Sequence, residues 1–173
     1  MSFLAKIFGR TPDPKAEFAP LYRAVISIAR QPAWYAECGV ADTEEGRFDM
    51  LSAALAVVIL RMEASADLRP AAALLTELFV EDIEGQLRQQ GIGDPTLGKR
   101  MGKLMSALGG RIGVYRAGLA QENDDSLVDA IGRNVSFNEG GGDSACVAAR
   151  LRTFDATLRN LSDRALIEAK FAR

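Results

Sequence analysis

The chain has 173 residues, of which 48% are hydrophobic and 25% charged, and its formal net charge is −2. These values fit one soluble globular domain with a sizeable core, and they argue against disorder and against a general nucleic-acid-binding protein. The sequence contains no histidine, which removes imidazole metal sites, histidine-ligated haem and the Ser-His-Asp and Cys-His catalytic sets. We therefore expect no metal site, no cofactor and no enzymatic activity.

Residues 1–14 are predicted to be an N-terminal amphipathic segment and linker, followed by a helical domain over 15–173. Four apolar side chains lie on one side of a short predicted helix: Phe3, Leu4, Ile7 and Phe8. This pattern indicates a weak contact with a membrane surface, and equally a disordered start or a hydrophobic flap on the domain. No apolar run approaches the ~20 residues that span a bilayer, so a peripheral position on the inner membrane is the most that we expect.

Two cysteines, Cys38 and Cys146, lie far apart in the sequence and belong to no C-x-x-C motif. Together with the lack of a signal peptide, they fit a reducing, cytoplasmic compartment. Each thiol is expected to be a small buried apolar group.

Apolar residues recur with helical spacing along almost the whole chain, and no alternating strand pattern is present. The first helix is predicted over about 15–30, and Trp34–Gly39 is expected to be a short helical turn closed by glycine. Asp42 is expected to cap the next helix, with Glu45 reaching back to the cap. That helix is apolar on every side over residues 53–60, which predicts a central, buried position.

A third helix is expected to begin at Pro70 and to stop at Gly91, and a fourth is expected over about 95–120. A smaller helical set carries the remaining residues, with Gly140–Gly142 as a flexible joint. The predicted fold class is therefore all-α: a single-domain bundle of about six to eight helices.

The helix expected over 95–120 is unusually rich in glycine. Its small residues fall on one face, beside the apolar stripe: Gly98, Gly102, Ser106, Gly109, Gly110 and Gly113. Each glycine costs the helix about 1 kcal/mol relative to alanine, and close approach of another backbone can offset this cost. We expect another helix of the same domain to cover this face, with a bound partner as the alternative.

A basic block accompanies the glycines, with Lys99, Arg100, Lys103, Arg111 and Arg116 against the single acidic Asp94 over residues 91–120. A solvated helix face is the simpler interpretation of such a block. A surface for an anionic partner is the alternative.

Arginine and aromatic residues gather in the predicted corner between the first helices. Arg30, Trp34 and Tyr35 precede the corner, and Asp42, Arg47 and Phe48 follow it. Planar donors beside large apolar rings make an anchor surface for a partner. Alternatively, the arginines bind carbonyls at helix ends and the aromatic rings plug the corner.

These residues resemble a known family, the ubiquinol–cytochrome c chaperones, which assist assembly of the cytochrome bc1 complex. The similar motifs are A-R-x-P-x-aromatic-Tyr at 29–35, D-T-x-x-G-R-F at 42–48, L-R-x-x-G-x-G-D at 87–94, and Gly110-Arg111 with Tyr115 shortly after. The resemblance covers about residues 20–120, and the last fifty or so match no family motif. Many members carry a histidine near the position of Ala54, and any role of that histidine does not carry over to this chain.

The resemblance implies a non-enzymatic, helical assembly chaperone that binds newly made cytochrome b or another bc1 subunit at the membrane, together with a second small assembly factor. A helical protein that binds a small ligand, lipid or haem, in an apolar groove beside the basic block is the alternative. The expected client-binding residues are Arg30, Trp34, Tyr35, Asp42, Arg47, Phe48, Arg111 and Tyr115.

Overall fold

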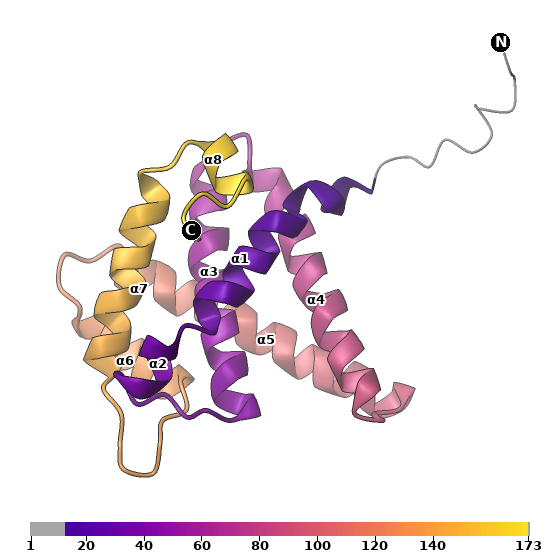
Figure 1. Ribbon diagram of the computed structural model, residues 1–173, viewed down its shortest axis with the longest axis horizontal. Coiled ribbons are helices and arrows are strands. Elements are labelled where there is room, and N and C mark those ends of the chain that lie inside the picture. The colour runs from indigo at the N-terminus through magenta and orange to yellow at the C-terminus, as the bar shows by residue number, and fades with distance from the viewer. Residues whose placement is uncertain (1–12, 173) are drawn as a thin grey trace, which may run out of the picture.

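Helix α3 (Glu44–Ala64) runs through the centre of the bundle, as Figure 1 shows for the computed structural model, which describes residues 13–172. It packs against α1 (Ala19–Ala29), α5 (Asp94–Leu119) and α7 (Ser144–Arg159). Every side chain over residues 52–59 is buried. The central, all-round burial predicted for this helix is therefore confirmed.

The remaining helices surround these four. They are α2 (Pro32–Ala36), α4 (Ala72–Gln89), α6 (Asp125–Asn134) and α8 (Asp163–Ile167), with 3₁₀ turns η2 (Pro14–Phe18) and η3 (Arg69–Ala71). Between residues 13 and 172 the only β-type pairing is an isolated bridge of Val40 with Phe137. The all-α class and the predicted number of helices are confirmed. None of the helices described is both long and apolar enough to cross a membrane.

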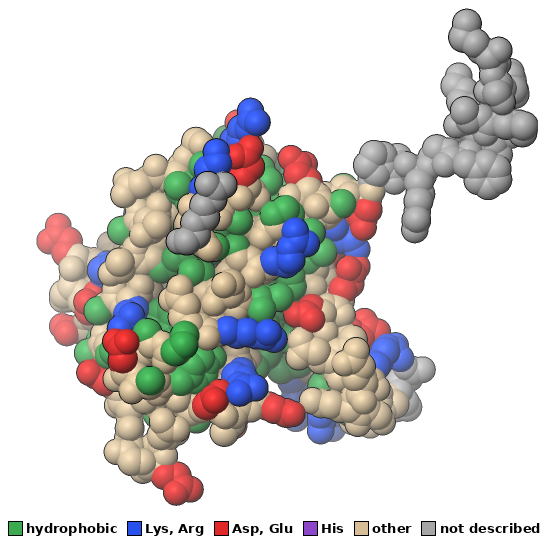
Figure 2. Space-filling view, in the orientation of Figure 1, with side chains coloured by type: hydrophobic (Ala, Val, Ile, Leu, Met, Phe, Trp, Pro, Cys, Tyr) green, Lys and Arg blue, Asp and Glu red, His purple; other side chains and the backbone are tan. Residues whose placement is uncertain are grey.

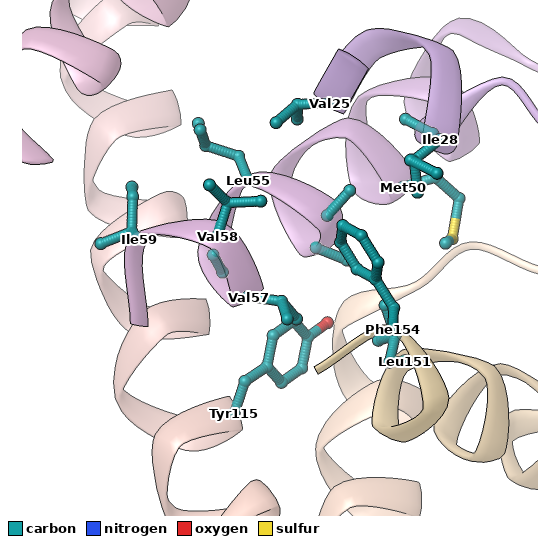
Figure 3. Packing of buried hydrophobic residues seen from close by; sticks show 14 of the residues in the cluster. Val25, Ile28, Met50, Leu55, Val57, Val58, Ile59, Tyr115, Leu151 and Phe154 are labelled. Carbon is teal, nitrogen blue, oxygen red and sulfur yellow. The ribbon is translucent and has the colours of Figure 1, made fainter. Parts of the chain in front are cut away.

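The core forms where three helices meet the buried length of α3 (Figure 3). Val25 comes from α1, Tyr115 from α5, and Leu151 and Phe154 from α7, and all point toward the α3 side chains around Val57. Fully burying an aliphatic or aromatic side chain contributes about 1.5–3 kcal/mol, so this shared cluster holds the four helices in one unit.

Glycine ends α4 as the sequence predicts. Gly91 has a φ of +79°, a left-handed conformation that glycine adopts without steric cost. Its N–H donates to the carbonyl of Arg88 (3.0 Å), and the Ile92 N–H donates to that of Leu87 (3.2 Å). These two bonds form a Schellman motif, which turns the chain from α4 into α5.

The cap of α3 differs from the prediction. Thr43, not Asp42, is the N-cap, and its Oγ1 accepts a hydrogen bond from the Gly46 N–H at 3.2 Å. The Asp42 carboxylate instead accepts from Arg47 Nε at 2.7 Å. Asp42 and Thr43 are neighbours, and either side chain could cap the helix. Because Asp42 pairs with the nearby Arg47, Thr43 takes the N-cap position.

The loop Gly140–Gly142, for which the sequence suggests a flexible joint, is packed tightly at its last glycine. A Cβ on Gly142 would lie 2.0 Å from the Phe137 ring, so the loop packs tightly there. The Asp143 N–H donates to the Cys38 carbonyl at 2.9 Å, and the Asn138 N–H to that of Gly39 at 3.0 Å. Gly142 therefore serves close packing against Phe137 and the loop after α2, whereas a Cβ on Gly140 or Gly141 would meet nothing within 4 Å.

Cys38 and Cys146 form a disulfide, so the prediction of two free thiols is wrong. The bond joins the loop after α2 to the first turn of α7 across 108 residues of sequence. The ordered turn through Gly142 brings the two ends together, and no local sequence pattern encodes that contact. Without free thiols, the cysteines no longer favour a reducing compartment.

The small-residue face of α5 is also unlike the prediction, because no helix of the described domain covers it. A Cβ placed on Gly98, Gly102, Gly109, Gly110 or Gly113 would meet nothing within 4 Å. Only Gly118, in the last turn, is closely packed, with Leu127 of α6 at 2.9 Å from a built Cβ. Most of the glycine cost in α5 is therefore not offset within the described domain.

Alanine in place of the open glycines should stabilise the protein. We expect Gly102→Ala with Gly109→Ala to raise the free energy of unfolding by about 1–2 kcal/mol, because alanine is the better helix former and has free space. Gly118→Ala should lower it by about 1–3 kcal/mol through overpacking against Leu127. Urea denaturation measures both, and destabilisation by the double variant would show that the open face is filled.

Removing the disulfide should destabilise the protein. A bond that closes so long a loop restricts the unfolded chain, and we expect Cys146→Ser to cost about 2–5 kcal/mol in denaturant unfolding. Mass spectrometry after alkylation of the unfolded protein checks the pairing itself. No label should be incorporated without reductant and two labels with it; two labels without reductant would show free thiols.

Candidate functional site

An open groove with a volume of about 1140 Å³ lies among α1, α2, α3, α4 and α5. Figure 2 shows a hollow on this face, between the body of the bundle and the lobe in which α4 ends, with basic and acidic side chains around it. Its apolar lining includes Ile26, Leu51, Ile83, Leu87 and Leu104. The Schellman turn after α4 closes one end of the helical pair that forms its wall.

Two aromatic residues of α2 fix the corner beside the groove. Trp34 is only 3% exposed, and its Nε1 donates to the Ile28 carbonyl at 2.7 Å. The Tyr35 hydroxyl donates to the Ala29 carbonyl at 2.8 Å. Both bonds satisfy carbonyls at the end of α1. The rings therefore plug the corner as the alternative predicts, but they bind the carbonyls that it assigned to the arginines. Burial raises the pKa of Tyr35. Tyr35 also lines the groove, whereas Trp34 does not.

The rim at the start of α3 carries the ion pair of Asp42 with Arg47, both exposed. The hydrogen bond from Arg47 holds the pKa of the Asp42 carboxyl below its usual range. Gly46, inside the same motif, has a steric role, since a Cβ there would lie 2.0 Å from the Ala41 carbonyl oxygen. The D-T-E-E-G-R-F motif thus requires glycine at this position, because the first turn of α3 packs directly against the loop that precedes it.

A buried ion pair lies at the floor of the groove. Arg111, 6% exposed, donates through Nη2 to Asp49 of α3 and to the Asn134 carbonyl at 2.8 Å. The other carboxylate oxygen of Asp49 accepts from the N–H and Oγ of Ser136, at 2.9 and 2.8 Å. One carboxylate therefore connects α3, α5 and the segment after α6.

This buried cluster is not fully satisfied. Arg111 Nε and Nη1 and the Tyr115 hydroxyl are buried and have no hydrogen-bond partner in the structure. The Phe48 ring lies over the guanidinium, 5.4 Å from its Cζ, which is a cation–π geometry. Tyr115 is fully buried, and this burial raises its pKa to about 12.

Six of the eight expected client-binding residues line the groove: Arg30, Tyr35, Asp42, Arg47, Phe48 and Arg111. Trp34 and Tyr115 lie in the interior and do not line the groove. The clustering of Asp49 with Ser136 was not predicted, because the two are far apart in sequence. Arg100 and Lys103, which the sequence marks only as part of a basic block, are groove residues.

Nothing in the groove indicates a metal centre. No group of three or more acidic or cysteine side chains within residues 13–172 could hold a metal ion. The carboxylates of α4 have other partners: Asp82 accepts from the Tyr22 hydroxyl at 2.8 Å, and Lys15 pairs with Glu81. Burial, and then this hydrogen bond, raise the pKa of Tyr22.

Comparison with known proteins identifies the family. The sequence model of the ubiquinol–cytochrome C chaperones matches residues 36–173. The chain belongs to this family. The match includes the last fifty residues, so the expectation that the resemblance ends near residue 120 is wrong. Membership in a family of chaperones implies a non-enzymatic role.

A solved structure agrees with the family match. The crystal structure of the Cbp3 homolog from Brucella abortus is 32% identical, covers 90% of this chain and 87% of its own, and superposes with a TM-score of 0.77. A comparison with curated proteins gave no significant match.

Removing one charge of the buried pair should destabilise the protein more than removing one charge of an exposed pair. Asp49→Asn leaves the Arg111 charge buried and unmatched, and we expect a loss of about 3–5 kcal/mol in the free energy of unfolding. Asp42→Asn removes an exposed pair and should change stability little. Denaturant unfolding of the two variants checks the contrast, and equal stability losses would refute the assigned role of Asp49.

Proposed function

We propose that this protein is a non-enzymatic chaperone for assembly of the cytochrome bc1 complex. In this proposal it holds newly made cytochrome b, or another bc1 subunit, in the groove between α3, α4 and α5. Family membership supports the chaperone role and the groove supports the binding site. The observation that carries the proposal is that one concave surface collects six motif residues beside an apolar lining.

The apolar lining suits a client that belongs in a membrane. Leu51 and Leu104 are partly exposed in the groove, and contact with an apolar segment would remove their surface from water, at about 25 cal/mol per Å². The polar rim would keep the empty groove hydrated. A chaperone needs both properties, since it must bind its client and later release it.

Three further features of this proposal stay predictions. A contact of Phe3, Leu4, Ile7 and Phe8 with the membrane surface falls on residues outside the described part of the chain. A peripheral position on the inner membrane depends on that contact. The second small assembly factor is proposed from the family resemblance alone.

The alternative, a lipid- or haem-binding protein, has less support. Thiolate is a common haem ligand, but both cysteines are in the disulfide. Tyr22 and Tyr35 donate their hydroxyls to other groups, and Tyr115 is fully buried. The groove is also open to solvent rather than enclosed, which suits a protein segment better than a fully buried small molecule.

Deletion of the gene and spectroscopy of membranes test the proposed function. We expect haem b and cytochrome c1 of the bc1 complex to fall severalfold and to return when the gene is restored. Normal levels of both in the deletion strain would refute the proposal.

Point variants in the restored gene locate the site. Leu104→Asp places a charge on the apolar lining of the groove and should fail to restore the bc1 complex. Val114→Asp puts the same charge on α5 at an exposed position outside the groove, and should restore it. Thermal unfolding confirms that each variant folds, and equal activity of the two variants would place client binding elsewhere.

A further inference from the structure

The acidic side chains around the groove are largely used within the protein. Four of the five have an internal hydrogen-bond or ion-pair partner: Asp42 with Arg47, Glu44 with Gln90, Asp49 with Arg111, and Asp82 with Tyr22 and Gln86. Glu45 is the fifth. Little negative charge is therefore left to meet the cations of the same surface.

Three cations of the groove are unmatched. Arg30 at the end of α1, and Arg100 and Lys103 on α5, are exposed and line the groove. Among the side chains that the structure describes, theirs form no hydrogen bond or ion pair. Arg100 and Lys103 are three residues apart, so they project from the same side of α5.

Two donors at the floor of the groove also lack an acceptor. Arg111 is nine-tenths buried, and its Nε and Nη1 have no partner. A buried donor without an acceptor is costly, and the Phe48 ring lies over this guanidinium. Donors thus outnumber acceptors both at the rim and beneath it.

We propose that the groove binds an apolar helix through a carboxylate on that helix, and that Arg100 and Lys103 receive the carboxylate. The inference rests on the proposed chaperone function and adds the chemistry by which a client segment is recognised. The apolar face of the helix would cover the lining around Leu51 and Leu104. In a segment that is already helical, the backbone groups are hydrogen-bonded within the helix. The groove therefore needs to match only its side chains.

Charge complementarity favours this occupant over a membrane surface. Anionic headgroups would also suit unmatched cations, but they form a broad surface that does not enter a concave groove. The cations here border a hollow with apolar lining residues, which favours an inserted segment such as a helix over a flat surface. A carboxylate on that segment also adds specificity, since a helix lacking it would leave both cations unmatched.

Two labelled synthetic peptides test the proposal by fluorescence anisotropy. Each is an amphipathic helix of about 18 residues, long enough to fold alone, with leucines on one face and neutral polar residues on the other. They differ only in one central residue of the polar border, Glu or Gln. We expect the Glu peptide to bind the native protein about fivefold more tightly, as one well-placed ion pair allows.

Protein variants then show which cations are responsible. Arg100→Gln with Lys103→Gln should reduce the preference for Glu to less than about twofold. Lys99→Gln with Arg133→Gln removes the same charge from exposed positions outside the groove, and should keep the preference. Raised salt should weaken binding of the Glu peptide more than that of the Gln peptide.

Each other result overturns the proposal in a distinct way. Equal binding of the two peptides would refute recognition of the carboxylate. It would leave the apolar client site and the proposed function unaffected. Loss of the preference for the Glu peptide in the control variant would mean that the preference arises from long-range attraction by the net charge of the protein. Binding to vesicles of anionic lipid that depends on Arg100 and Lys103, with no binding of either peptide, would make the occupant a membrane. Restoration of bc1 content in the deletion strain judges the proposed function separately.

Discussion

The buried ion pair of Asp49 with Arg111 connects the core of the bundle to its groove. Asp49 belongs to the central helix α3, Arg111 to the groove wall α5, and the same carboxylate holds Ser136 of the segment after α6. Desolvating two charges is expensive, and the pair is tolerated only because further hydrogen bonds satisfy the carboxylate. The position of α5, and with it the width of the groove, therefore depends on this pair.

Helices and their ends were predictable from the sequence where local chemistry decides them. The central position of α3 followed from a run apolar on every side, and Gly91 ends α4 because a left-handed residue is required there. The prediction was wrong where two neighbouring side chains can both act as the helix cap. Asp42 and Thr43 can both cap α3, and only the three-dimensional position of the Arg47 side chain selects between them.

Contacts between distant segments could not be predicted in this way. The pairing of Cys38 with Cys146 and the packing of Gly142 against Phe137 depend on how α7 returns to the loop after α2. The motifs did predict part of the groove lining, including Arg30, Arg47 and Phe48, because motif residues at the end of α1 and the start of α3 meet at one corner. They did not distinguish lining from support: Trp34 and Tyr115 are interior residues, while Arg100 and Lys103 belong to the groove.

The glycines that lower the stability of α5 lie mainly between Leu97 and Gly110, which is also the less buried part of the helix. From Leu97 to Gly110 only Leu97 and Leu108 are buried, whereas the last turns carry the buried Arg111 and the core residues Tyr115 and Leu119. The first part thus combines low helix propensity with little burial. It is the same part that presents Arg100, Lys103 and Leu104 to the groove. Binding surfaces are drawn from the less stable parts of a fold, and here the less stable part is one wall of the groove, anchored at its end by the buried pair.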